Sequence, residues 1–316
     1  MFDKCLVRAI YWGLLVILVT LFWDNGVADE VAAEINWRIA SKRKHLSETE
    51  LEHLLRKNTY LQLNHLESLT DKQAEMLGTA IGFGLDRVRE LSDHQVKWLG
   101  RARFVSLDGL TALTDKQAKS LGDCEQVSLA SLESITPAQC QSLQNLETLN
   151  LDGLKCISNE VAAALGNIQH LTLNSLHALS PEQIEMFDET ASLELSGLTT
   201  LTDAQAVSFG KCNGIHLCLN GLRQLTDFQA EQLSNCGSLY LGGLKEITDQ
   251  QAESLGRVTF LGLSGLTELS EPAAAHLSSV AVLHLNGIHQ LTESQWKHLD
   301  QCLRVIGPKA KKSLEK

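Results

Sequence analysis

The sequence predicts an α/β fold: a right-handed solenoid of repeats, with a parallel sheet on its concave face and short helices on its convex face. Three observations lead to this prediction. One phrase recurs eleven times along the 316-residue chain, at steps of 22 residues except for the step of 24 from Leu193 to Leu217. The front of each copy alternates apolar and polar residues with the period of a strand. The back of each copy opens with residues that cap a helix.

The front half of each copy predicts a short strand. In the copy "LQLNHLESLTDKQAEMLG", Leu61 and Leu63 point to one side of the chain, and Tyr60 and Gln62 point to the other. The position of Leu63 is leucine in every copy, so we expect it to be a buried column. The copies begin at Leu61, Phe83, Val105, Val127, Leu149, Leu171, Leu193, Leu217, Leu239, Leu261 and Leu283.

The back half of each copy predicts a helix of about two turns. Ser or Thr stands at its start in all eleven copies, and nine copies have Gln three residues later, as in Thr70 and Gln73. This pair predicts a capping box, in which the hydroxyl accepts the backbone N–H of the Gln and the side-chain amide oxygen of the Gln accepts the backbone N–H of the Ser or Thr. Glycine after the helix, as at Gly78, predicts that the helix stops there. Gly100, Gly122, Gly166, Gly210 and Gly256 occupy the same position.

Neither half of a copy can be stable alone. A helix of about seven residues is shorter than the ~12–15 residues that are marginal in water. Stacked copies, however, place their leucine columns in one continuous core and pair their strands side by side. The phrase therefore recurs because one copy cannot bury its own apolar face.

The phrase "LxLxxLxxLTDxQAxxL" resembles the leucine-rich repeat family, most closely its cysteine-containing subclass, whose units read LxLxxCxxITDxGLxxL. Leu66 stands in place of that cysteine, and Gln73 and Ala74 stand in place of Gly-Leu. The resemblance covers residues 61–304, with a degenerate copy at 45–55. It implies a horseshoe-shaped solenoid whose concave face binds another protein. The unit is shorter than is usual in the subclass, and no F-box precedes it, so a ubiquitin-ligase adaptor is not implied.

Four segments follow from this reading: residues 1–28, an N-terminal cap at 29–60, the repeats at 61–304 and a basic tail at 305–316. Residues 1–28 have the layout of a secretory signal. Lys4 and Arg8 precede the apolar run "AIYWGLLVILVTLFW", and Gly26 and Ala28 are small residues before Asp29. We expect an exported protein, periplasmic, in the cell envelope or secreted. The alternative is an uncleaved membrane anchor at residues 9–23; otherwise the mature chain has no membrane span.

Charge and motifs narrow the function. The net charge of −11 argues against a nucleic-acid partner, because phosphate binding needs a concentrated basic face. The sequence has no G-x-S-x-G elbow, P-loop or glycine-rich dinucleotide turn. It also has no CxxC or HExxH spacing that would favour a metal. We therefore expect no catalytic residues, no metal site and no cofactor, and hence a protein that is not an enzyme.

The cysteines predict buried thiols. Four of them occupy the column just before the strand, which other copies fill with small or branched apolar residues. Cys212 and Cys236 belong to consecutive copies, which leaves a disulfide as the alternative. The ~4.8 Å between strands is long for the ~3.8 Å between disulfide Cβ atoms, so free thiols are favoured. The four residues are Cys124, Cys212, Cys236 and Cys302.

Bulky residues gather on the outward strand positions near the C-terminal end. They fall on four successive strands, where the predicted concave face is otherwise small and polar. We interpret them as the anchor for a protein partner. The alternative is a structural or self-associating cell-envelope protein with no dedicated ligand, because isolated exposed aromatics are common. The residues are His216, Tyr240, Phe260, Val282 and His284.

The outward positions of each copy form three columns, at the positions of Tyr60, Gln62 and Asn64. The third outward column, that of Asn64, is rich in Asn and Asp and precedes glycine in seven copies, as at Asp108 and Gly109. We interpret this column as turn chemistry rather than as a ligand site.

Overall fold

The computed structural model of the chain describes residues 43–57, 59–212 and 214–307. The predicted export signal and most of the predicted tail lie outside these residues. The described residues up to Ala130 form one compact unit, and those from Ser131 form a second. Among them, no helix combines the length and the apolar character needed to cross a membrane.

The first unit opens with a helix and continues as strands that alternate with helices. Its strands β1 to β4 pair in chain order, all parallel. The elements are α4 (Glu48–Lys57), β1 (Tyr60–Gln62), α5 (Asp71–Leu77), β2 (Gly82–Gly84), α6 (Asp93–Leu99), β3 (Phe104–Ser106), α7 (Asp115–Leu121) and β4 (Gln126–Ser128).

The second unit repeats the same alternation, and its strands β5 to β12 also pair in chain order, all parallel. Its elements are α8 (Pro137–Leu143), β5 (Thr148–Asn150), α9 (Asn159–Leu165), β6 (His170–Thr172), α10 (Pro181–Glu185), β7 (Ser192–Glu194), α11 (Asp203–Lys211), β8 (His216–Cys218), α12 (Asp227–Leu233), β9 (Ser238–Tyr240), α13 (Asp249–Leu255), β10 (Phe260–Gly262), α14 (Glu271–His276), η1 (Leu277–Ser279), β11 (Val282–His284), α15 (Glu293–Leu299) and β12 (Arg304–Ile306).

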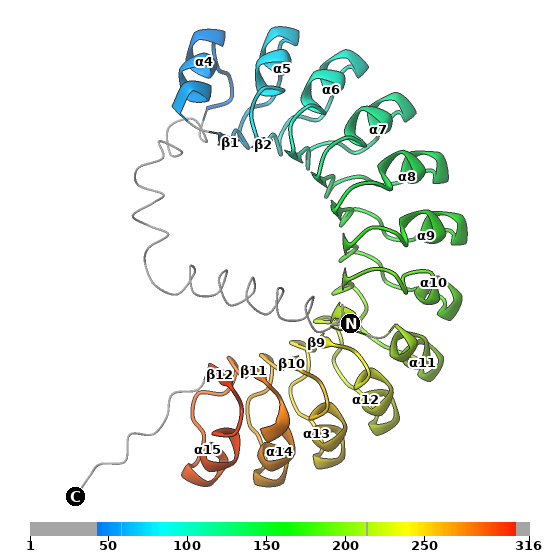
Figure 1. Cartoon of the computed structure of the whole chain (residues 1–316), viewed down its shortest axis with the longest axis vertical. Coiled ribbons are helices and arrows are strands. Elements are labelled where there is room, and N and C mark those ends of the chain that lie inside the picture. The colour runs from blue at the N-terminus through cyan, green and yellow to red at the C-terminus, as the bar shows by residue number, and fades with distance from the viewer. Residues whose placement is uncertain (1–42, 58, 213, 308–316) are drawn as a thin grey trace, which may run out of the picture. The chain divides into compact units, whose positions relative to one another are not determined.

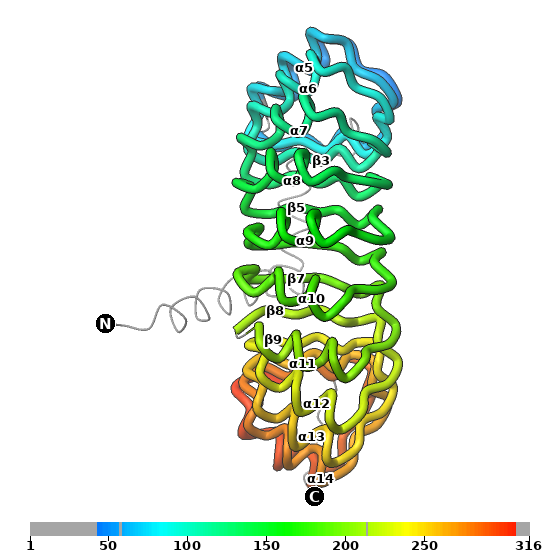
Figure 2. Tube along the Cα trace, turned by 90° about the vertical axis from the view of Figure 1, so that its right-hand side faces the viewer, coloured from blue at the N-terminus to red at the C-terminus, as the bar shows by residue number. Residues whose placement is uncertain are grey.

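Within each unit the strands line the inner side of the curve and the helices lie outside (Figure 1), and successive turns of the chain stack on one another (Figure 2). Parallel strands that alternate with short helices confirm the predicted leucine-rich-repeat solenoid.

The core consists of the predicted columns. Leucine at the position of Leu63 is at most 1% exposed in every copy, and Leu151 is fully buried. Most strands bury their middle residue and leave its two neighbours partly exposed, as in β5. This alternation confirms the predicted division into inward and outward positions.

The predicted capping boxes are also confirmed. All nine copies with Ser or Thr followed by Gln form both hydrogen bonds of the box. The other two copies, at Ser158 and Ser270, keep only the bond in which the N3 backbone N–H donates to the hydroxyl oxygen. Each short helix therefore has a defined first turn, which fixes where the chain leaves the strand.

The helices end at the predicted glycines, with the exception of Gly210, which lies inside α11. Gly78 ends α5 in a right-handed conformation, with φ −62°. Among the described residues, only Gly214 and Gly307 have positive φ. A Cβ at Gly78 would overlap the carbonyl oxygen of Trp98, one copy further along the chain. These helix-end glycines are needed because the backbones of neighbouring copies approach closely.

The third outward column also joins copies rather than shaping turns alone. The side-chain oxygen of Asp152 accepts the backbone N–H of Asn174 at 2.7 Å, and that of Asn174 accepts the N–H of Ser196 at 2.9 Å. Asn220 and Gly242 repeat the arrangement at 2.7 Å. The column therefore satisfies backbone donors along the stack, and the earlier interpretation as local turn chemistry was incomplete.

Candidate functional site

Three of the five predicted anchor residues form a continuous array of rings. The ring centroids of His216 and Tyr240 are 4.9 Å apart with planes tilted by 38°. Those of Tyr240 and His284 are 6.0 Å apart and meet edge to face at 72°. We call His216, Tyr240 and His284 the ring array. It reaches from β8 to β11 on the outward face of the strands.

A glycine makes the ring array possible. Gly262 on β10 pairs in register with Tyr240 on one side and with His284 on the other. A Cβ at Gly262 would overlap Cδ1 of the Tyr240 ring. The bare backbone of β10 therefore leaves room for Tyr240 to lie over it and reach His284. The sequence shows this glycine, but its importance depends on the register.

The other two predicted residues lie on the same face, in the register column of His216, whereas Tyr240 and His284 lie in the next column. Phe260 is half-buried and pairs in register with Val282. Val282 is only 6% exposed, so it offers little surface to a partner. The structure thus brings three of the predicted residues together, places Phe260 beside them and covers Val282.

Burial keeps the ring array uncharged at neutral pH. Desolvation, with a smaller contribution from His170, lowers the pKa of His216 to about 4. Desolvation and the nearby Arg304 lower the pKa of His284, and desolvation raises the pKa of Tyr240. In the described part of the chain, Nε2 of His284 is buried without a hydrogen-bond partner.

Arg304 is the functional candidate that the sequence analysis missed. It opens β12, a strand that extends beyond the last predicted copy, and it pairs in register with Val282. Within the second unit, acidic residues on the strand face stop at Glu194 on β7; the outward positions of β8 to β12 carry no carboxylate. Arg304 is the one residue with a fixed charge among those positions, and it forms no ion pair with a described residue.

A similar arrangement of smaller extent occurs in the first unit. Gly82 on β2 lies between Tyr60 and Phe104, and a Cβ there would be 2.7 Å from Cδ2 of Tyr60. Desolvation, followed by the charges of Asp86 and Asp108, raises the pKa of Tyr60. An aromatic ring therefore lies over a bare strand in both units, but only the second unit extends it into a three-ring array.

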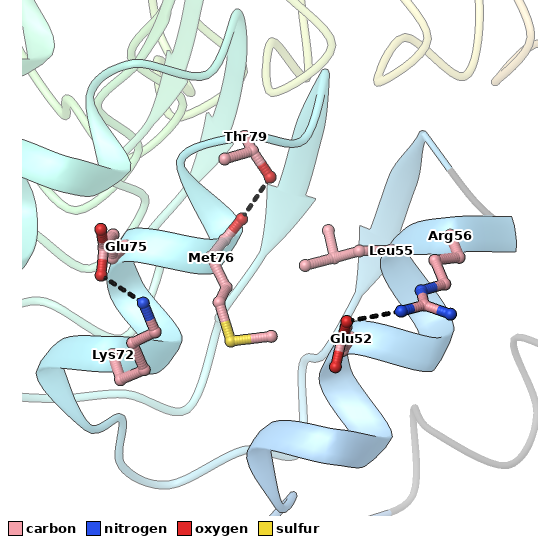
Figure 3. Close-up of a pocket in the computed structure, with 7 residues that line it drawn as sticks. All are labelled: Glu52, Leu55, Arg56, Lys72, Glu75, Met76 and Thr79. Carbon is pink, nitrogen blue, oxygen red and sulfur yellow. Dashed lines mark hydrogen bonds and ion pairs between the residues drawn. The ribbon is translucent and has the colours of Figure 1, made fainter.

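A shallow pocket between α4 and α5 is a weaker candidate (Figure 3). Leu55 and Met76 supply its apolar atoms, and two ion pairs stand at its sides: Glu52 with Arg56 at 2.7 Å and Lys72 with Glu75 at 2.8 Å. Because these charges already neutralise each other, the pocket has no unsatisfied group to select a ligand.

The described cysteines offer no second candidate site. The seven within the described residues are free thiols, and Cys124, Cys212 and Cys236 are buried as predicted, whereas Cys302 is half-exposed. Desolvation raises the pKa of Cys124 and Cys236 to about 12 and that of Cys212 to about 11, so these thiols stay protonated. The described residues hold no group of three or more His, Cys, Asp or Glu side chains that could bind a metal.

Solved structures of leucine-rich-repeat proteins share this fold. An internalin from Listeria monocytogenes aligns with a TM-score of 0.53 at 15% identity, over 85% of this chain and 79% of its own. TLR13, solved in a complex with ssRNA13, aligns with a TM-score of 0.56 at 18% identity, over 84% of this chain and 41% of its own. Toll from Drosophila, solved in its glycosylated form with Spatzle, aligns with a TM-score of 0.54 at 15% identity, over 82% of this chain and 42% of its own.

The chain therefore spans less than half the length of TLR13 and of Toll. No protein-family model and no curated protein matches the sequence. At 15–18% identity the structural likeness establishes the fold, which is that of a leucine-rich-repeat protein.

Proposed function

We propose that this chain is a non-catalytic scaffold that binds a protein partner on the strand face of its second unit. The observation that carries the proposal is the ring array. Large aromatic side chains held against each other on an otherwise small, polar surface are typical of the anchors that dominate protein interfaces. Their contact with one another also reduces the entropy that a partner would have to remove on binding.

The comparisons support binding of a macromolecule in general. Toll was solved with the protein Spatzle and TLR13 with an RNA. For this chain we favour a protein. Nucleic acid requires several cations against its phosphates, and the outward positions of β8 to β12 offer Arg304 alone on a chain of net charge −11.

We further propose that residues 1–28 direct export, so that the scaffold works outside the cytoplasm. The support is the order of Lys4 and Arg8, the apolar run and the small residues before Asp29. N-terminal sequencing of protein from the native host tests this. A start near Asp29 agrees with cleavage, and intact Met1 on membrane-bound protein favours the anchor at residues 9–23. Intact Met1 on soluble cytoplasmic protein contradicts both.

Site-specific photo-cross-linking in the native host tests the proposed surface. Ser238 is a suitable position because it pairs in register with His216 and with Phe260 on the strand face. Glu253, exposed on α13, is the matched control on the helix side.

A cross-linker at Ser238 should capture a discrete protein, whereas one at Glu253 should not, and Tyr240→Ala should abolish the product. Products made only of this chain would instead support a self-associating envelope protein. Equal capture from both positions would overturn the assignment of the surface.

A further inference from the structure

A cation stands beside the ring array. Arg304 is half-buried on β12, and its charge lowers the pKa of His284, which places the two side chains within electrostatic reach. No carboxylate of the described residues forms an ion pair with Arg304. A guanidinium that is partly removed from water and has no counter-ion is predisposed to accept one.

The surroundings reinforce this electrostatic bias. The outward residues of the adjacent strand β11 are Val282 and His284, those of β10 are Phe260 and Gly262, and Tyr240 follows on β9; none of them carries a negative charge at neutral pH. Elsewhere on the face of the same unit, Asp152 and Glu194 lie on or next to β5 and β7. Although the protein as a whole is acidic, this end of the strand face is thus neutral to positive and carries aromatic side chains.

We propose that this surface recognises a short acidic segment of the partner protein, with a carboxylate against Arg304 and an apolar side chain against Tyr240 and Phe260. This inference rests on the proposed function and specifies the chemistry of the partner. A carboxylate can accept two parallel N–H bonds from a guanidinium, which gives geometric specificity as well as attraction.

The size of the surface sets the length of the segment. Five strands at a spacing of ~4.8 Å span about 19 Å between β8 and β12, which matches about six residues of extended chain. A segment that crosses the strands can therefore place its carboxylate on β12 and its apolar side chain on β9 or β10.

A single-stranded nucleic acid is the competing occupant, because bases stack on aromatic rings. Its phosphates would follow one another along the whole face, however, and only Arg304 offers a fixed positive charge there. One carboxylate suits one guanidinium better than a continuous polyanion does.

Selection of peptides from a random library against the full-length chain tests the proposal. We expect the selected peptides to share an Asp or Glu next to an apolar residue. Fluorescence polarisation should show that Arg304→Ala weakens their binding by about tenfold, that Arg304→Lys retains part of it, and that raised salt weakens it. Arg223→Ala removes an exposed arginine outside the strand positions of the same unit and should leave binding unchanged.

The outcomes separate the two proposals. Selected peptides that Tyr240→Ala weakens but that lack acidic residues, or that bind Arg304→Ala as tightly as the parent, overturn the acidic-segment inference and leave the binding surface standing. A single-stranded oligonucleotide that binds more tightly than any selected peptide also overturns it. If no selected peptide depends on Tyr240, the proposed surface itself fails, and the inference fails with it.

Discussion

The side chain of Gln251 joins two repeats by using both ends of its amide. Its Oε1 accepts the backbone N–H of Thr248 at 3.0 Å within its own copy, and its Nε2 donates to the carbonyl of Leu225 in the preceding copy at 2.6 Å. Glutamate could complete the first bond but could not donate the second. The same bond to the preceding copy occurs at Gln73, Gln95, Gln117, Gln183, Gln205, Gln229 and Gln295.

We therefore expect Gln251→Glu to lower the free energy of unfolding by about 2 kcal/mol. The change leaves the Leu225 carbonyl unpaired and places a carboxylate where the side chain is buried. Urea denaturation measures the loss. Gln250→Glu, at an exposed position on the same helix, is the control and should cost no more than ~0.5 kcal/mol. Equal effects of the two changes would mean that the bond between copies is unimportant.

Leu151→Ala should lower the free energy of unfolding by roughly 2–5 kcal/mol. Leu151 is fully buried in the invariant column, so its removal leaves a cavity in a core that runs along the stack. Chemical denaturation with a constant slope against denaturant is the measurement. A loss smaller than ~0.5 kcal/mol would contradict the assignment of inward positions, because a register slip of one residue exchanges the faces.

Substitution by alanine should destabilise the protein to different extents at two glycines, because a different constraint requires glycine at each position. A Cβ at Gly265 would overlap the carbonyl oxygen of Gly242 in the preceding copy, so Gly265→Ala forces the two copies apart. Gly214 has open space around it but a φ of +78°, so Gly214→Ala meets only backbone strain. We expect costs of about 3 kcal/mol and about 1 kcal/mol, respectively, in thermal or urea unfolding. The reverse order would show that copies can separate easily.

The pKa of His216 predicts how stability depends on pH. Its folded value, about 4, lies below the ordinary value of 6.5, so the unfolded chain takes up the proton first as the pH falls. The contribution of neutral His216 to the free energy of unfolding is therefore fully present above pH 6.5 and is lost as the pH falls from 6.5 toward 4. Between pH 7 and pH 4.5 the parent should lose about 2 kcal/mol more than His216→Gln. An NMR titration midpoint of His216 near its ordinary value would refute this account.

Truncation of Tyr240 and Phe260 together to Ala should weaken a captured partner by at least ~2 kcal/mol, the scale of an interface hot spot. Both side chains point away from the core, so the melting temperature should change little. Isothermal titration with the partner is the measurement. If the double variant binds as tightly as the parent, the anchor lies elsewhere.

Thr148→Ala combined with Ser192→Ala is the control for this pair, since both residues lie on the same strand face of the second unit. Ser106 and Ser128 are unsuitable, because their hydroxyls donate to Asp86 and Asp108 at 2.7 and 2.5 Å, respectively. Removing those hydroxyls would disturb two half-buried carboxylates as well as the surface.

The sequence alone was sufficient for the periodic features of this protein. Alternation around Leu63 identified the inward positions, and the pairs of Thr and Gln identified where each helix begins. These features depend on interactions within one copy and on a pattern repeated eleven times, so no long-range information was needed.

Only the tertiary structure decided the features that depend on contact between copies. It showed that Gly78 is needed where neighbouring backbones approach closely, and it gave the Gln251 amide a second hydrogen-bond partner, the Leu225 carbonyl, one copy away. It also added β12, and with it Arg304, to the strand face. These relationships require the exact distance between neighbouring backbones, which periodicity does not specify.

The candidate site divides in the same way. The sequence placed His216, Tyr240 and His284 on the outward face, because successive side chains of a strand point to opposite faces of the sheet. The tertiary structure decided that the three rings touch, since Tyr240 reaches His284 only across the bare backbone at Gly262. It also decided that Val282 is covered by its surroundings, although the alternation along its strand places it on the outward face. The alternation along a strand determines to which face a side chain points, whereas packing with neighbouring strands determines how much of that side chain a partner can reach.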